Sequence, residues 1–303
     1  MFHFDENNGD LALLAPLQQL SINVGSISFH PIYNPRAKGF LSKVFVIYNS
    51  YFDRILFLDA DNVPVRDPSF LFTSPEFEAN GAVFWPDFWH PRRTLFNLHA
   101  RSMLWELLDL PFVDMFEQES GQLLVDRTRH AAPLELVYFY AFHDPNYFES
   151  LQLVYGDKDL FRLAWIKSGA TYHMIEALPA LAGKDIDGSF CGMTMVQHDT
   201  EGKVLFLHRN QHKLTGGRDN QMDDAVNRDV NGSETQMIED EDIPPDSYPD
   251  PVIWTHLLSF RKDANRRYYA IDAYRAPPQF HSGDRATVVD MRGNVDISSY
   301  RSS

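Results

Sequence analysis

Two aspartates, Asp59 and Asp61, stand one residue apart directly after the apolar stretch RILFL (54–58). That stretch has no helical period, so it predicts a strand covered on both faces, as in a parallel sheet. Residues i and i+2 of an extended chain point the same way, so the two carboxylates converge on one point. Such carboxylates repel each other unless a cation lies between them, which favours a divalent ion, Mn²⁺ or Mg²⁺. A plain Asp-rich turn is the structural alternative.

A metal site built from two aspartates on an α/β sheet supports two kinds of reaction. It holds the diphosphate of a nucleotide sugar, whose sugar is then transferred while the metal neutralises the leaving group. It also serves phosphatases of the haloacid dehalogenase type, in which the first aspartate is the nucleophile. Val63 fits the phosphatase motif, but the aspartates follow a complete predicted helix and earlier strands, which favours sugar transfer.

An aromatic cluster follows another predicted strand. The stretch FWPDFW places Asp87 between Trp85 and Trp89. This pattern is typical of sugar sites, where rings lie against C–H faces and the acid binds hydroxyl groups. A core aromatic cluster beside an Asp turn is the alternative.

Polar residues also mark the stretches FEQESGQLLVD, GDKDLF and VLFLHRNQHKL. The first places Glu119 just before a predicted strand, where a plain turn is the alternative. The second opens a predicted helix with Asp157 and Lys158. The third ends a strand on His208, whose imidazole suits manganese and supplies a third ligand to the aspartate pair. A lone histidine after a strand is otherwise a common structural residue.

Composition limits the classes of protein to consider. The chain has 303 residues, 44% of them hydrophobic, which suits one large globular domain or two small ones. A net charge of −15 argues against nucleic acid as a partner. A single cysteine, Cys191, excludes an intrachain disulfide and a cysteine-based zinc site. No stretch has the ~18 apolar residues of a membrane span, and the first residues lack a basic signal-peptide region.

The elements that must position these residues follow from hydrophobic periodicity. Met1–Phe4 reads as the end of a strand, so we expect the chain to begin inside its domain. The predicted helices span 11–20, 39–51, 94–108, 128–142 and 159–169. The predicted strands span 21–29, 54–58, 81–85, 122–126 and 202–208. Residues 251–260 resume a strand-like or short helical pattern.

An acidic segment divides the chain. Residues 216–250 hold eleven acidic residues and two arginines, and therefore nine of the fifteen net negative charges. Few of its residues are apolar, so we expect a disordered loop or insertion. The predicted organisation is a catalytic domain at 1–215, this insertion at 216–250, and a C-terminal segment at 251–303 that packs on the core and ends in a polar tail.

One long run and five ordered blocks after it carry a resemblance to a known family. The run KVFVIYNSYFDRILFLDADNVPVRDPSFLF is followed in order by GAVFWPDFW, ESGQLLVD, GDKDLFRLAW, FCGMTMVQHD and LFLHRNQHKL. Together they resemble the α-mannosyltransferases of glycosyltransferase family 71, which build mannan branches in the Golgi of fungi and oomycetes. The resemblance implies a GT-A fold, a Rossmann-like mixed α/β sheet flanked by helices. It also implies metal-dependent, retaining transfer of mannose from GDP-mannose to a mannan or glycoprotein glycan.

The resemblance assigns roles to individual residues. The metal ligands would be Asp59, Asp61 and His208. Residues expected to bind the donor are Lys43, Asp59, Asn62, Ser120, Gly121, Gln122, Lys158 and Lys213. Glu119 and Asp157 would be the catalytic carboxylates near the reacting carbon, in supporting roles. Trp85, Asp87 and Trp89 would shape the sugar or acceptor pocket.

The sequence departs from the family at its start. Family members carry an N-terminal membrane anchor, and a first strand and helix that bind the base. We expect this chain to lack these segments. Localisation in the Golgi lumen is therefore implied by the resemblance alone. A truncated, inactive paralogue that acts as a binding subunit is the alternative to an enzyme.

Overall fold

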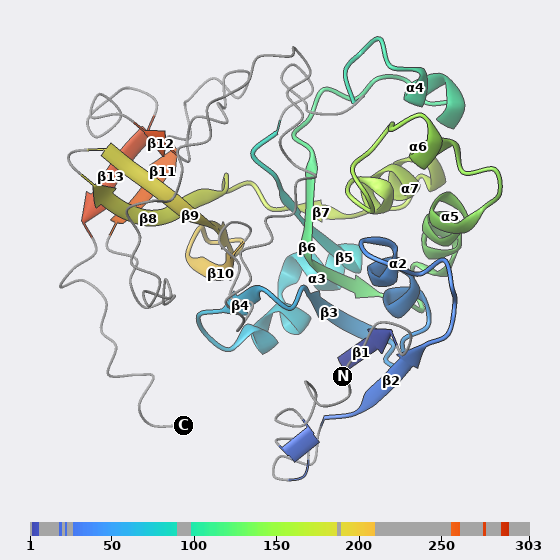
Figure 1. Ribbon diagram of the computed structural model, residues 1–303, viewed down its shortest axis with the longest axis horizontal. Coiled ribbons are helices and arrows are strands. Elements are labelled where there is room, and N and C mark those ends of the chain that lie inside the picture. Colours follow the sequence, from blue (N-terminus) through green and yellow to red (C-terminus); the bar gives the residue numbers. More distant parts are fainter. Residues whose placement is uncertain are drawn as a thin grey trace, which may run out of the picture.

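The computed structural model describes residues 2–5, 18–19, 22, 27–89, 98–186, 189–209, 256–260, 275–276 and 286–290. Mixed sheets flanked by helices make up these parts, as Figure 1 shows, which confirms the expected GT-A-like α/β class. The acidic segment at 216–250 and Lys213 lie outside the described residues. Within those residues, no helix has the length and apolar character needed to cross a membrane.

A four-stranded sheet forms the centre of the molecule, in the order β3-β6-β5-β7. Its strands are β3 (Arg54–Leu58), β6 (Gln118–Asp126), β5 (Ala82–Pro86) and β7 (His173–Met174). Strand β3 runs antiparallel to β6, so the expectation of a parallel strand before Asp59 is wrong. The apolar character of β3 comes instead from packing on both of its faces.

Alternating side chains of this sheet enter two different core clusters. Leu123 and Val125 of β6 pack in one cluster, and Leu124 between them packs in the other. Phe84 and Trp85 of β5 divide in the same way. This is the period of two expected for a strand that is covered on both faces.

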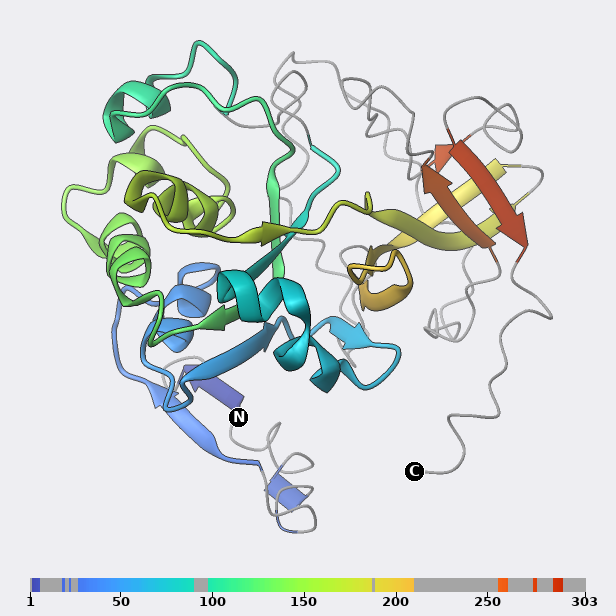
Figure 2. The same cartoon turned by 180° about the vertical axis from the view of Figure 1, so that it is seen from behind.

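Helices cover the two faces. The first cluster contains apolar residues of α2 (Leu41–Tyr48), α5 (Ala131–Phe142), α6 (Tyr147–Ser150) and α7 (Leu160–Ser168). The second cluster contains residues of η2 (Pro68–Thr73) and α3 (Pro75–Asn80), which lie in front of the sheet in Figure 2. The predicted helices at 39–51, 128–142 and 159–169 are therefore confirmed within a few residues at their ends.

One predicted helix is shorter than expected. Helix α4 spans Met103–Leu108, whereas the apolar pattern predicted 94–108. Ser102 caps it, because its side chain accepts a hydrogen bond from the Leu104 backbone N–H at 3.0 Å. Residues 98–102 are not helical, and 90–97 lie outside the described residues.

The second sheet is antiparallel and is joined to the first by the aspartate pair. It contains β13 (Ala286–Asp290), β11 (His256–Phe260), β8 (Ala180–Ile186), β9 (Ser189–His198), β10 (Val204–His208) and β4 (Asn62–Pro64), with β12 (Arg275–Ala276) beside β9. Residues 256–260, for which the pattern allowed a strand or a short helix, form strand β11. The chain leaves β3 at Leu58 and enters β4 at Asn62, so Asp59 and Asp61 lie where the two sheets meet.

A separate pair of strands lies near the start of the chain. Strand β1 (Phe2–Asp5) runs parallel to β2 (Phe29–Ile32). The strand predicted at Met1–Phe4 is therefore present. The strand predicted at 21–29 falls largely outside the described residues.

Candidate active site and metal centre

The aspartate pair and His208 meet at the junction of the two sheets. One potential ligand atom from each of Asp59, Asp61 and His208 lies within 4.8 Å of the others. His208 ends β10 opposite Asn62 of β4, which brings its ring next to the loop between β3 and β4. Its Nε2 atom lies 3.3 Å from Asp61 Oδ1.

Backbone hydrogen bonds fix the turn that carries the two aspartates. The N–H of Asp59 donates to the Gly121 carbonyl at 2.9 Å, and the N–H of Asn62 donates to the Asp59 carbonyl at 3.0 Å. The N–H of Arg209 donates to the Asp61 carbonyl at 2.9 Å. The turn is therefore tied to strands of both sheets.

The three ligands suit a divalent transition metal. Two carboxylates and one imidazole form a mixed oxygen and nitrogen set, which fits Mn²⁺ better than the all-oxygen surroundings typical of Mg²⁺. Burial raises the pKa of Asp59 even though Lys43 lowers it. Burial lowers the pKa of His208, but Glu119 and Asp61 outweigh burial and raise it to about 10. The site thus has an excess of carboxylate charge that a cation offsets.

Lys43 links helix α2 to this centre. Its Nζ atom lies 3.1 Å from Asp59 Oδ2 and 3.3 Å from Asp157 Oδ2, and it donates to both oxygens of Ser120 at 2.8 and 3.0 Å. Burial lowers the pKa of Lys43, but the carboxylates of Asp157, Asp59 and Glu119 together raise it by more. The net pKa is therefore raised, and the ammonium stays charged. Burial raises the pKa of Asp157 to about 6, against the effect of Lys43.

The beginning of β6 faces the metal ligands. Glu119 Oε1 accepts a hydrogen bond from the Gly121 N–H at 2.6 Å and lies 3.4 Å from His208 Nδ1. Burial raises the pKa of Glu119, but His208 and Lys43 lower it to about 2. A Cβ atom on Gly121 would come within 2.6 Å of the His208 ring, so only glycine leaves room for the imidazole.

Two of the predicted donor-binding residues bond to each other. Asn62 donates to the side chain of Gln122 at 2.6 Å and to the Gly121 carbonyl at 2.9 Å. Both residues are buried: 4% of Asn62 is exposed, and none of Gln122. In this conformation they join β4 to β6, and their contact with a donor stays a prediction.

The turn before α7 carries a second group of buried charges. Lys158 Nζ lies 2.6 Å from both Asp87 Oδ2 and Glu117 Oε2. Burial raises the pKa of Asp87 to about 7 despite Lys158, because two carboxylates share one ammonium. Asp159 accepts a hydrogen bond from the Gln118 N–H at 2.9 Å and lies 2.6 Å from Arg162 Nη2.

The two tryptophans of the predicted sugar pocket differ in position. Trp85 has no exposed surface, and its indole N–H donates to the His198 carbonyl at 2.8 Å. Its ring packs against Phe206, so in this conformation Trp85 is a core residue, which was the structural alternative. Trp89 is half-buried beside Phe88 and Phe116. A sugar contact by Trp89 stays a prediction.

Three buried polar residues near the site were not predicted from the sequence. Glu117, Gln118 and Arg162 are 0–1% exposed, and Gln118 Oε1 accepts from the Arg162 N–H at 2.9 Å. In the structure the run EQES makes contacts that alternate from one residue to the next, as in a strand. In the sequence its polar residues had indicated a turn. Strand β6 therefore begins four residues earlier than predicted, at Gln118.

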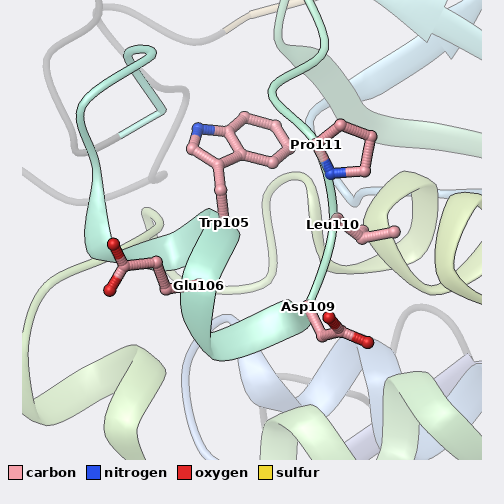
Figure 3. Close-up of a pocket in the computed structure, with 5 residues that line it drawn as sticks. All are labelled: Trp105, Glu106, Asp109, Leu110 and Pro111. Carbon is pink, nitrogen blue, oxygen red and sulfur yellow. The ribbon is translucent and has the colours of Figure 1, made fainter.

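A shallow hollow of about 440 Å³ lies away from this centre. It is lined by Trp105, Glu106, Asp109, Leu110 and Pro111, as Figure 3 shows. Helix α4, which supplies part of this lining, lies far from β4 in both whole-molecule views (Figures 1 and 2). Its Trp105 indole N–H already donates to the His99 carbonyl, at 3.0 Å. The hollow therefore takes no part in the metal centre.

Comparison with known proteins places the chain among sugar transferases. A family model described as "Mannosyltransferase putative" matches residues 12–199. Alpha-1,2-mannosyltransferase MNN2 of Saccharomyces cerevisiae is 28% identical over 198 residues, covering 54% of this chain and 33% of that protein. Alpha-1,2-mannosyltransferase MNN5 of the same species is 23% identical over 294 residues, covering 79% of this chain and 48% of that protein.

A further relative carries a different linkage in its name. "Putative alpha-1,3-mannosyltransferase MNN12" of Candida albicans is 26% identical over 208 residues, covering 60% of this chain and 23% of that protein. The chain spans from about a quarter to a half of the length of these relatives.

Proposed function

The chain belongs to the α-mannosyltransferases of glycosyltransferase family 71, and from this premise we propose that it transfers mannose from GDP-mannose to a glycan acceptor. The proposal includes a divalent cation, Mn²⁺ or Mg²⁺, as cofactor. The observation that carries it is the convergence of Asp59, Asp61 and His208 within 4.8 Å at the junction of the two sheets. The excess of carboxylate charge at this centre suits a divalent ion, which in turn would bind a phosphate-bearing ligand.

The side chains around this centre suggest how transfer proceeds. Asp59, Asp61 and His208 would hold a divalent ion, which would supply positive charge to stabilise the leaving diphosphate. In transfer, the bond between the mannose C1 atom and the diphosphate oxygen breaks, a bond from C1 to the acceptor oxygen forms, and the proton of the acceptor hydroxyl passes to the leaving diphosphate. Lys43 keeps Asp59 and Asp157 in place through contacts of 3.1 and 3.3 Å. Positioning of this kind lowers the barrier without a covalent enzyme intermediate.

Asp157 and Glu119 are proposed to support the reaction. Both carboxylates are buried and both lie beside Lys43 or a proposed metal ligand. The proposed donor-binding residues remain Lys43, Asp59, Asn62, Ser120, Gly121, Gln122, Lys158 and Lys213. Asp87 and Trp89 remain proposed for the sugar pocket.

The acceptor and the compartment are also proposals. The two Saccharomyces relatives are named as alpha-1,2-mannosyltransferases, so we propose an α-1,2 linkage to a mannan or glycoprotein glycan. The name of the Candida relative makes α-1,3 the linkage to test against it. The Golgi lumen is proposed from the family resemblance.

The phosphatase alternative is not supported. The matched family and the relatives are all mannosyltransferases. The alternative of an inactive binding subunit predicts a folded protein without affinity for GDP.

Calorimetry of GDP and UDP binding, with and without Mn²⁺, tests the proposal. We expect Mn²⁺-dependent binding of GDP that Asp61→Asn removes, and transfer of mannose from GDP-mannose to an α-mannoside acceptor. Digestion of the product with linkage-specific mannosidases then distinguishes α-1,2 from α-1,3. A folded chain that binds neither nucleotide overturns the enzyme proposal in favour of the binding subunit.

A further inference from the structure

We propose that Glu119 is a positioning residue that orients His208 for the metal ion, with Nε2 as the ligand atom and Nδ1–H held by the Glu119 carboxylate. This rests on the metal site proposed above. It gives Glu119 a different part from that of a carboxylate that touches the reacting sugar.

The two ring nitrogens of His208 have different neighbours. Nε2 lies 3.3 Å from Asp61 Oδ1, on the side of the proposed ligands. Nδ1 lies 3.4 Å from Glu119 Oε1, on the side of β6. A metal that binds between Asp59 and Asp61 is therefore reached by Nε2, and the nitrogen left to Glu119 is Nδ1. Metal-bound histidines commonly donate their second ring N–H to a carboxylate, which fixes the tautomer and the ring orientation.

Glu119 is itself held in place. Its Oε1 atom accepts the hydrogen bond from the Gly121 N–H at 2.6 Å, and only 9% of the residue is exposed. The carboxylate is therefore fixed by its own strand before any ligand binds. A hydrogen-bond acceptor that is fixed on a strand can hold an imidazole ring in one orientation.

Gly121 gives separate support for a built histidine pocket. A Cβ atom at this position would lie 2.6 Å from His208 Nδ1, 2.7 Å from its Cε1 and 2.9 Å from Glu119 Oε1. The backbone of β6 thus approaches the ring closely at the same place where Glu119 meets it. The ring is enclosed by β6 on the Nδ1 side and reaches the aspartates by its Nε2 side.

The test measures metal binding alone, by Mn²⁺ titration followed by calorimetry and electron paramagnetic resonance on the full chain. We expect Glu119→Ala to weaken Mn²⁺ affinity by about 10- to 100-fold. Glu119→Gln keeps an oxygen acceptor for Nδ1–H, so most of the affinity should return. Glu117→Gln is the matched control, because Glu117 lies two residues away, is also buried and contacts Lys158 instead of His208.

A second measurement reports the tautomer directly. In protein labelled with ¹⁵N-histidine and loaded with Zn²⁺ as a diamagnetic probe, we expect the His208 spectrum of an Nε2-bound, Nδ1-protonated ring. Zn²⁺ bound through Nδ1 overturns the proposal. This measurement on the unmodified protein decides the question even if Glu119→Ala does not fold.

The outcomes separate this inference from the proposed function. If the unmodified chain binds no Mn²⁺, the proposed metal site fails and the inference with it. If it binds Mn²⁺ and Glu119→Ala binds equally well, only the positioning role is wrong. Loss of mannosyl transfer with full Mn²⁺ affinity in that variant shows that Glu119 acts on the substrate.

Discussion

Lys43 Nζ lies 3.1 Å from Asp59 Oδ2, and this single contact joins helix α2 to the first aspartate of the proposed metal centre. The same ammonium lies 3.3 Å from Asp157 Oδ2, in the turn before α7. Three segments that are distant in the sequence therefore share one buried cation. Lys43 and Asp157 are both buried, so water does not compensate the Asp157 carboxylate if the ammonium is removed.

Replacing Lys43 with methionine should destabilise the protein as well as weaken donor binding. The change leaves Asp59 and Asp157 without their common cation, and we expect the free energy of unfolding to fall by about 3 kcal/mol. Adding Asp157→Asn should recover part of that loss, because one uncompensated carboxylate is removed. Urea unfolding measures both effects. Lys38→Met, at an exposed position on the same segment, is the control and should change stability by less than about 0.5 kcal/mol.

Gly121→Ala should disturb the metal centre through one methyl group. The new Cβ atom would lie 2.6 Å from the His208 ring, so the ring must leave its position between β6 and Asp61. We expect a loss of about 1–3 kcal/mol in unfolding free energy. We also expect Mn²⁺ to raise the melting temperature of this variant less than that of the unmodified chain. The double variant with His208→Ala removes the main clash, so stability should recover while Mn²⁺ binding does not.

The charge cluster around Lys158 makes stability depend on pH. Burial raises the pKa of Asp87 to about 7, above the ordinary value of 3.8, despite the nearby Lys158. The folded state therefore binds this proton more tightly than the unfolded state does. Its contribution to stability is present below pH 4 and is lost as the pH rises to 7, by up to about 1.4 kcal/mol per pH unit. Asp87→Asn should flatten this part of the stability profile.

Urea unfolding at several pH values between 3 and 8 measures that slope. Asp67→Asn provides a control of opposite sign, because a backbone hydrogen bond from Ser69 lowers the pKa of Asp67. The stabilisation by Asp67 is present above its ordinary pKa and is lost as the pH falls. An Asp87→Asn profile parallel to that of the unmodified chain would contradict the expected titration of this cluster.

The sequence predicted the convergence of Asp59, Asp61 and His208 better than the surroundings of these residues. An apolar strand that ends in two aspartates is a local pattern, so β3 and the convergence of its aspartates were readable from periodicity. The antiparallel pairing of β3 with β6 could not be predicted in this way. The polar residues at the start of β6 resemble a turn, and only their buried contacts in the folded chain show that they belong to a strand. The contact of Lys43 with Asp59 and Asp157 is likewise long-range. The resemblance predicted a donor-binding lysine there, but no local pattern indicates which carboxylates a lysine meets.

Trp85 illustrates how a composition signal can have two physical causes. Tryptophans beside an aspartate are typical both of sugar sites and of core clusters next to a turn. Trp85 is fully buried against Phe206 and donates to the His198 carbonyl at 2.8 Å, whereas Trp89 is half-buried. The spacing of four residues did not distinguish the two positions, because burial depends on which strand covers each ring.

Trp85→Phe should therefore act on stability and leave acceptor binding unchanged. The smaller ring loses the hydrogen bond to His198 and leaves a cavity beside Phe206, so we expect about 1–3 kcal/mol less unfolding free energy. The KM for an α-mannoside acceptor should stay within twofold of the unmodified enzyme. Trp89→Phe is the matched substitution at the half-buried position, where a raised acceptor KM with little loss of stability is expected. A raised KM in Trp85→Phe with unchanged stability would show that this ring contacts the sugar after all.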